Sequence, residues 1–78
     1  MKKLIKLIAI ELVDLPEEVD VVETKNNGYI KVELRVADQD MGKVIGKQGK
    51  IAKAIRNVAK AAATKKNQKV EVKITQND

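Results

Sequence analysis

The segment from residue 19 to residue 36, VDVVETKNNGYIKVELRV, constrains the fold of this chain more than any other feature. Apolar and polar residues alternate along 29–36, so the apolar side chains share one face of a strand. The Asn27-Gly28 pair before this strand tolerates the positive φ angles of a tight hairpin turn. The sequence therefore predicts two antiparallel strands, 19–25 and 29–36, with one apolar face that other elements must cover. That face carries Ile30, Val32, Leu34 and Val36.

Helical periodicity predicts the elements that cover this face. Residues 3–14 read as a helix that ends before Pro16, with an inward face of Leu4, Ile5, Ile8 and Leu12. A short helix bears Met41, Val44 and Ile45 and takes Asp38 or Asp40 as its cap. A longer helix, about 50–64, has Ile51, Ile55, Val58 and Ala62 facing inward, and 69–75 reads as a last strand.

The predicted order of elements is α-β-β-α-α-β. One sheet of three strands with the helices packed on one face lets each element bury its apolar side. We therefore predict a single α+β domain over residues 1–78.

Composition excludes several classes of function. The chain has no Cys and no His, so disulfides and a structural zinc site are not expected. The pair Asp38 and Asp40 fits helix capping better than a divalent-ion site. No nucleophile–base system is present, and we predict a binding module that needs no metal or cofactor, not an enzyme.

The N-terminal segment has a basic start and an apolar run, which are features of a targeting signal. Lys6 and Glu11 interrupt that run, and no small-residue cleavage site follows it. No stretch approaches the roughly 18 apolar residues of a membrane span. The sequence thus predicts a cytoplasmic protein without a membrane-spanning segment.

The charge of this chain is distributed unevenly. Residues 41–70 hold nine basic residues and no acid, whereas the other 48 residues sum to −4. Lysines that serve only solubility would tolerate glutamates four residues away, which would also support a helix. An acid-free basic stretch of this length favours a surface that attracts a polyanion such as nucleic acid.

Two glycines three residues apart interrupt the helical pattern in VIGKQGKIAKAIR (44–56). Without a Cβ atom, Gly46 and Gly49 let the backbone of a ligand approach closely. The N-terminus of the helix that follows suits a phosphate. The pattern matches neither a P-loop nor a dinucleotide fingerprint. The simplest alternative is a tight turn in which glycine only supplies a positive φ.

The stretch IGKQG between two helices resembles the loop of K-homology (KH) domains. The order of elements is similar to that of the type II fold, over the whole chain. The stretches MGKVIGKQGKIAKAIR and AKAAA are similar to those of the small bacterial single-KH proteins of the KhpA type. Ala52 departs from the KH pattern, because many KH domains have a bulky aliphatic residue there.

The resemblance implies a cytoplasmic bacterial protein that binds single-stranded RNA, with the loop clamping about four nucleotides. It also implies a role as an RNA chaperone or post-transcriptional regulator, a homodimer, and pairing with a larger KH-containing protein of the Jag/EloR (KhpB) type. The residues expected to contact RNA are those of the loop and its flanking lysines: Gly46, Lys47, Gln48, Gly49, Lys43, Lys50 and Lys53. Weaker candidates are Arg56, Lys60 and Arg35, and Tyr29 is expected to pack at a strand end.

Two alternatives remain open at this stage. The first is a subunit that uses the KH fold mainly for dimerisation, because Leu7 and Ile10 look surplus to one small core and the alanine-rich run of Ala59, Ala61, Ala62 and Ala63 allows close backbone approach. The second is a protein that binds single-stranded DNA. No residue that would recognise a 2′-hydroxyl can be located in the sequence, so only the family resemblance favours RNA.

Overall fold

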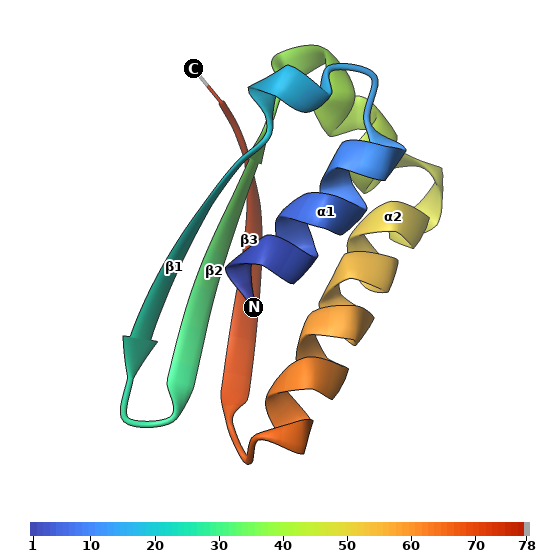
Figure 1. Ribbon diagram of the computed structural model, residues 1–78. Coiled ribbons are helices and arrows are strands. Elements are labelled where there is room, and N and C mark those ends of the chain that lie inside the picture. Colours follow the sequence, from blue (N-terminus) through green and yellow to red (C-terminus); the bar gives the residue numbers. More distant parts are fainter. Residues whose placement is uncertain (78) are drawn as a thin grey trace.

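The computed structural model describes residues 1–77, except for the side chains of residues 47 and 48. Two helices, α1 and α2, lie on one side of a three-stranded sheet (Figure 1). The predicted α+β architecture of a type II KH domain is confirmed. The elements are α1 (Lys2–Leu12), the short 3-10 helix η1 (Pro16–Glu18), β1 (Asp20–Asn26), β2 (Tyr29–Val36), α2 (Asp38–Lys65) and β3 (Lys69–Gln76).

The sheet has the order β1-β2-β3, with β1 antiparallel and β3 parallel to the central strand β2. Asn27 and Gly28 have φ angles of 49° and 79°, as the predicted tight turn between β1 and β2 requires. The parallel pair needs a long crossover connection, and α2 supplies it. The predicted hairpin is therefore confirmed, and β3 is left as an edge strand beside α2.

The apolar face of the sheet is covered as predicted. Ile30, Val32, Leu34 and Val36 of β2 are almost completely buried, and Val70, Val72 and Ile74 of β3 pack against the same core. In α1 the buried residues are Ile5 and Ala9, whereas Leu4, predicted to face inward, is 38% exposed. Ile5 and Ala9 are four residues apart, so the buried residues of α1 form one narrow line along the helix. Leu7 is exposed, and Ile10 packs against the core.

The buried face of α2 differs from the prediction. Ala52, Ile55, Ala59 and Ala63 are buried, whereas Ile51, Val58 and Ala62 are only half-buried. Successive residues turn by about 100° around a helix, so the helix is rotated by roughly one residue from the expected face. Small side chains on the buried face let the helix backbone approach the sheet closely. Ala52 is buried without disturbing the fold.

Asp40 does not cap α2, contrary to prediction. The cap position is Ala37, and it makes no side-chain hydrogen bond. The Asp40 side chain is fully buried, and its two carboxylate oxygens accept hydrogen bonds from the backbone N–H groups of Asp14 and Leu15, each at 3.0 Å. Asp40 therefore ties the loop after α1 to the first turn of α2. Asp38 stays exposed in that first turn.

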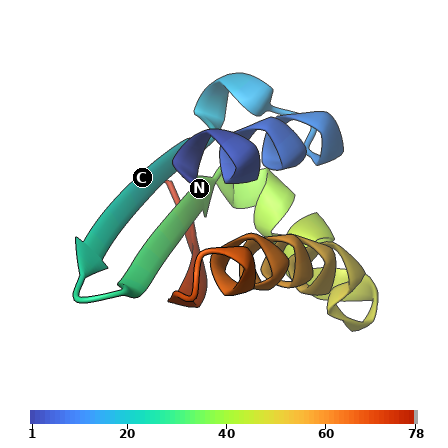
Figure 2. The same cartoon turned by 60° about the horizontal axis from the view of Figure 1, so that its bottom comes forward.

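The two helices predicted around GKQG are one continuous helical segment with a bend. Gly49 has a φ of 67°, which lies in the left-handed region and cannot continue a right-handed helix. The axis of α2 changes direction near this residue (Figures 1 and 2). The sequence thus predicted the position of the interruption correctly. It predicted two separate helices there, whereas the structure has one bent helix.

The end of α2 brings β3 alongside the helix. Asn67 has a φ of 55°, and the N–H of Gln68 donates to the carbonyl of Ala63 at 2.8 Å, which is the pattern of a Schellman helix end. The N–H of Lys69 then donates to the carbonyl of Gly28 at 2.9 Å. This contact starts β3 next to the hairpin turn, so β3 runs back along α2.

Candidate nucleic-acid interface

The straight part of α2 after Gly49 has two different flanks on either side of its buried face. Lys53, Arg56 and Lys60 are exposed on one flank, with spacings of three and four residues. The other flank is apolar and carries Val58, Ala61 and Ala62. These three basic residues therefore form one exposed group beside the buried face of the helix.

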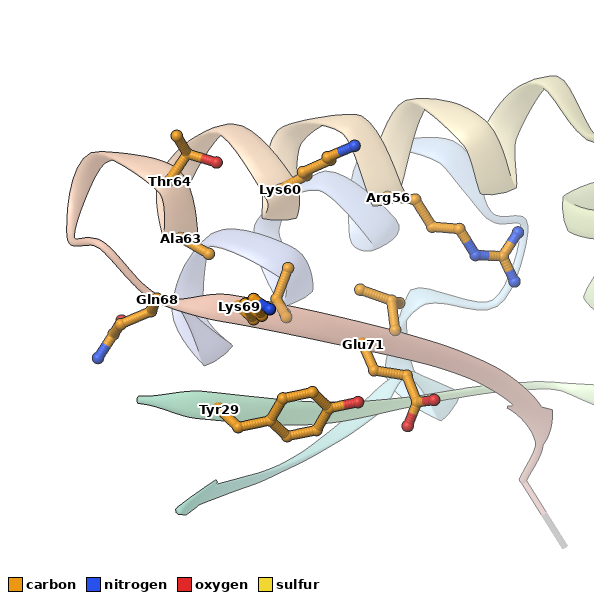
Figure 3. Close-up of a pocket in the computed structure, with 10 residues that line it drawn as sticks. Tyr29, Arg56, Lys60, Ala63, Thr64, Gln68, Lys69 and Glu71 are labelled. Atoms are coloured by element: carbon orange, nitrogen blue, oxygen red, sulfur yellow. The ribbon is translucent and has the colours of Figure 1, made fainter. Parts of the chain in front are cut away.

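The basic flank borders an open hollow between α2 and the edge strand β3. The hollow has a volume of about 660 Å³. Arg56 and Lys60 line it from α2, and Figure 3 shows the Arg56 side chain pointing toward β3. The two weaker candidates on α2 thus line this hollow, while Lys53 lies one turn nearer to the bend at Gly49.

The glycine bend lies at the other end of this basic flank. Gly46 and Gly49 are partly exposed, and a Cβ atom at either position would meet nothing within 4 Å. The space beside both glycines is therefore open to a ligand. Lys50 is exposed directly after the bend. The side chains of Lys47 and Gln48, which were predicted to contact RNA, lie outside the described part of the structure.

Ile45, which the sequence places with Met41 and Val44 in the apolar spacing of a short helix, is 52% exposed. It lies directly before Gly46, so an apolar side chain adjoins the bend. Neighbouring Val44 is fully buried and takes the core position. The sequence offered no signal to separate the two, because consecutive apolar residues in a short helix compete for the same face.

Lys43 makes an ion pair with Asp14 at the end of α1, with Nζ and Oδ1 3.2 Å apart. Both side chains are largely exposed. Lys43 is therefore joined to the same loop that Asp40 holds by hydrogen bonds. The Asp14 carboxylate partly neutralises the charge of Lys43.

Arg35 lies away from the other candidates. Its position in β2 points to the sheet face that the helices leave uncovered, opposite the face of Leu34. Its Nε donates to Glu33 at 2.9 Å, and one terminal nitrogen lies 3.9 Å from an Asp20 oxygen. The hydrogen bond from Arg35, with a second from Thr75, lowers the pKa of Glu33. The structure thus does not bring Arg35 together with the lysines of α2.

Sequence reasoning missed the residues that close the hollow at the hairpin end. Tyr29, Thr64, Gln68, Lys69 and Glu71 all line it. Tyr29 was predicted as a packing residue, yet its side chain is 39% exposed. The pairing of Tyr29 with Lys69 in the parallel register places it there. Only the pairing of β3 with β2 reveals this, and β3 is distant in sequence.

The apolar flank of α2 borders a second, shallower depression with Leu4 of α1. Val58, Ala61 and Ala62 line it from α2. Ala59 and Ala63, which in the dimerisation alternative would allow a partner to approach closely, are buried inside the domain and are not available to a partner. The exposed apolar surface is thus smaller than the alanine-rich sequence suggests.

In the described residues, no helix is long and apolar enough to cross a membrane. Within this described part of the chain, no three acidic side chains lie close enough together to hold a metal ion.

Comparison with known proteins identifies the family. The family described as KhpA/KhpB, KH domain, matches residues 2–74. The chain belongs to this family. Among its curated relatives is the RNA-binding protein KhpA of Clostridium perfringens, 60% identical over 74 residues, which cover 95% of this chain and 99% of the relative. The RNA-binding protein KhpA of Caldanaerobacter subterraneus is 54% identical with the same coverage. The family is one of KH domains, not of enzymes.

Solved structures support the fold of this KH domain. Era in complex with MgGDPNP and nucleotides 1506–1542 of 16S ribosomal RNA superimposes with a TM-score of 0.69 at 20% identity. Aquifex aeolicus Era bound to GDP.AlF4− gives 0.68 at 18% identity. The match covers 96% of this chain and 29% of each Era chain. At such low identity the likeness establishes the KH fold alone.

Proposed function

We propose that this KhpA/KhpB-family protein binds single-stranded RNA along the basic flank of α2. The sugar-phosphate backbone lies against Gly46 and Gly49, where the open space allows close approach. Lys50 and Lys53 neutralise the phosphates. The observation that carries this proposal is the continuity between the glycine bend, the basic flank and the hollow beside β3. The RNA-binding names of relatives up to 60% identical support it.

The experiment measures binding of labelled single-stranded RNA across a salt series. The test variant is the Lys47→Asp, Gln48→Asp double variant at the bend. A matched control, Lys6→Asp with Gln39→Asp, makes the same change in net charge at exposed positions of α1 and of the first turn of α2. We expect wild type and control to bind with a clear negative salt slope and the bend variant to bind at least tenfold more weakly.

Equal binding by wild type and bend variant would reject the clamp at the bend, provided that circular dichroism shows the variant folded. Parallel titrations with DNA of the same sequence test the alternative ligand. Tighter binding of DNA would replace RNA in the proposal. We expect RNA to be preferred.

We propose in addition that the protein acts in the cytoplasm as an RNA chaperone or post-transcriptional regulator and works as a homodimer. The depression of Leu4, Val58, Ala61 and Ala62 supports dimerisation, because these four apolar side chains meet there, with Lys60 and Lys65 beside them. Gly46, Gly49 and Lys50 do not line this depression, so two copies joined there leave the bend of each copy accessible. Linking two weak sites raises the affinity for a long RNA.

Sedimentation equilibrium of Ala61→Glu tests the dimer, with Gln39→Glu as an exposed control elsewhere on α2. We expect the Ala61 variant to become monomeric and to lose affinity for long RNA while it stays folded. A wild type that sediments as a monomer would reject the homodimer. The family description includes KhpB, so co-sedimentation with a larger KH-containing protein of that type tests the alternative partner.

A further inference from the structure

The hairpin turn between β1 and β2 contains a reactive pair of residues that the proposed function does not use. Asn27 and Gly28 form this turn at the end of the sheet (Figure 1), and both are exposed. Asn27 is the only one of the five asparagines that a glycine follows in the sequence. An Asn-Gly pair joins a side-chain amide to a backbone nitrogen that no neighbouring Cβ atom shields.

The reaction open to such a pair is an internal cyclisation with loss of ammonia. The backbone nitrogen of Gly28 gives up its proton to water and attacks the side-chain carbonyl carbon, Cγ, of Asn27. A bond forms between these two atoms, and the bond from Cγ to the amide nitrogen breaks. The amide nitrogen leaves as ammonia, with a proton from water. The product is a cyclic imide, and no atom is oxidised or reduced.

Water then opens the cyclic imide at one of its two carbonyl carbons. Opening at the side-chain carbonyl gives aspartate and leaves the main chain as it was. Opening at the backbone carbonyl gives isoaspartate, in which the main chain runs through the former side chain. Water is the only co-reactant, so the residues of the turn and the solvent suffice for the whole sequence.

The groups that must react are accessible in the structure. Among the turn and loop hydrogen bonds of the described residues, none is donated by the N–H of Gly28. A Cβ atom at Gly28 would meet nothing within 4 Å, so the space beside its nitrogen is open. The side-chain hydrogen bonds found in residues 1–77 do not involve Asn27. Neither partner of the reaction is therefore held by another group.

Asn67 provides a comparison within the same molecule. It is exposed and has a φ of 55°, close to the 49° of Asn27. The next residue is Gln68, whose N–H donates to the carbonyl of Ala63 at 2.8 Å. The side chain of Gln68 also hinders an approach to its own nitrogen. Since exposure and backbone conformation are alike, the following residue is what distinguishes the two asparagines.

The turn has to open before the ring can close, because the cyclic imide does not fit the left-handed conformation of Asn27. Residues 24–29 are all exposed, so this end of the hairpin has few buried contacts to lose. Local opening of such segments costs little free energy compared with unfolding of the domain. A positive φ is also unfavourable for a residue with a Cβ atom, which assists the opening.

The two products have different effects on the fold. Aspartate tolerates a positive φ, and Asp-Gly is a common pair in tight hairpin turns. Isoaspartate lengthens the main chain within a connection of only two residues. The carbonyl of Gly28 accepts the N–H of Lys69 at 2.9 Å, and this contact starts β3. A longer turn moves that carbonyl, so β3 loses the hydrogen bond at its first residue.

We propose that Asn27 is a site of spontaneous modification, which converts through a cyclic imide to isoaspartate and aspartate and, as isoaspartate, loosens the start of β3. The reaction needs no enzyme and is not reversed by the protein, so the modified fraction increases with the age of the molecule. This inference goes beyond the proposed RNA binding and does not depend on it.

Mass spectrometry of stored protein tests the chemistry. Wild-type protein is kept at neutral and at mildly alkaline pH and digested with trypsin in mild acid, which releases residues 26–31 as one peptide. Fragment ions distinguish Asn27 from Asn26. We expect Asn27 to convert at least about tenfold faster than Asn67, because glycine leaves the attacking nitrogen unshielded. The alkaline sample is expected to react faster, since the nitrogen must lose its proton.

The variant Asn27→Gly is the control for this reaction. Glycine accepts a positive φ, so the turn is kept, but it has no side-chain amide. The variant is expected to produce no modified form of the 26–31 peptide beyond that from Asn26. Equal conversion at Asn27 and Asn67 of the wild type, or no conversion at Asn27, would overturn the proposal.

Hydrogen exchange then tests the effect on β3. Ion exchange separates the modified wild-type protein, because the new carboxylate lowers the formal net charge of +5 by one. The variant Asn27→Asp carries the same charge without the longer main chain. We expect the N–H of Lys69 to exchange at least about tenfold faster in the modified protein than in Asn27→Asp, and the urea midpoint to be lower. Equal exchange in the two would overturn the role of the longer turn.

Discussion

Lys43 of α2 and Asp14 of the loop after α1 form an ion pair, with Nζ and Oδ1 3.2 Å apart. Lys43 lies three residues before Gly46, so in the proposed complex the Asp14 carboxylate competes with RNA phosphates for this lysine. We predict that Asp14→Asn raises RNA affinity about twofold at low salt, because it releases Lys43. Asp20→Asn makes the same charge change beside Arg35 and is expected to have less effect. A fluorescence titration compares the two, and an equal response would mean that net charge alone matters.

Asp40 is predicted to matter for stability far more than its neighbour Asp38. Asp40→Ala leaves the N–H groups of Asp14 and Leu15 without their acceptor inside the protein. We expect a loss of about 3 kcal/mol in the free energy of unfolding, measured by urea denaturation. Asp38→Ala, in the same helix turn but exposed, is expected to change it by about 0.5 kcal/mol or less. Similar losses in both variants would contradict the buried hydrogen bonds.

The glycines of α2 are predicted to respond in opposite directions to alanine. A Cβ atom meets nothing within 4 Å at Gly42 or Gly49, so only backbone conformation differs. Gly49→Ala is expected to cost about 1 kcal/mol because of its φ of 67°. Gly42→Ala is expected to stabilise the protein by roughly 0.5–1 kcal/mol, as alanine does inside a helix. Thermal unfolding of the two variants measures the difference, and a stabilised Gly49 variant would argue against the bend.

Close packing of α2 on the sheet leads to another prediction. Ala59 is fully buried, so Ala59→Leu is expected to destabilise the domain by about 1–3 kcal/mol through overpacking. Ala54→Leu, at an exposed position of the same helix, is the matched control and is expected to be nearly neutral. Chemical denaturation of both tests this. A tolerated leucine at position 59 would mean that the helix does not lie as close as described.

Glu33 is predicted to make stability depend on pH in the acidic range. The hydrogen bonds from Arg35 and Thr75 hold its pKa below the usual value, so the contribution is present above the unfolded pKa of about 4.3 and disappears as pH falls through the folded pKa. Glu33→Gln is expected to be less stable than wild type at neutral pH and equal to it in strong acid. Urea midpoints over a pH series measure the gap, and a constant gap would contradict this linkage.

The sequence predicted the parts of the fold that depend on local pattern. Alternation in 29–36 and the turn at Gly28 identified the hairpin correctly, since both signals act between neighbouring residues. The rotation of α2 was predicted wrongly, because Ile51 and Val58 are more apolar than Ala52 and Ala59. The short distance between α2 and the sheet requires small residues on the buried face of the helix. The pattern of a single sequence does not reveal that distance.

The residues of the candidate site also fall into those that local spacing predicts and those that depend on the packing of distant segments. The group of Lys53, Arg56 and Lys60 follows from helical spacing, so it was predictable. Arg35 lies apart from this group, because the alternation of β2 places it on the sheet face that the helices leave uncovered. Tyr29 lines the hollow only because β2 pairs with β3, and its partner Lys69 is 40 residues away in the sequence.

The parallel pairing of β2 with β3 also affects how this protein is made. The ribosome synthesises the bend and the basic flank first, whereas β3, which forms one wall of the hollow, follows as the last strand. Until β3 has left the exit tunnel, the sheet has no third strand and α2 has nothing to close the hollow against. A nascent chain therefore exposes the lysines of α2 before the hollow exists, and the proposed RNA-binding surface is complete only after β3 has formed.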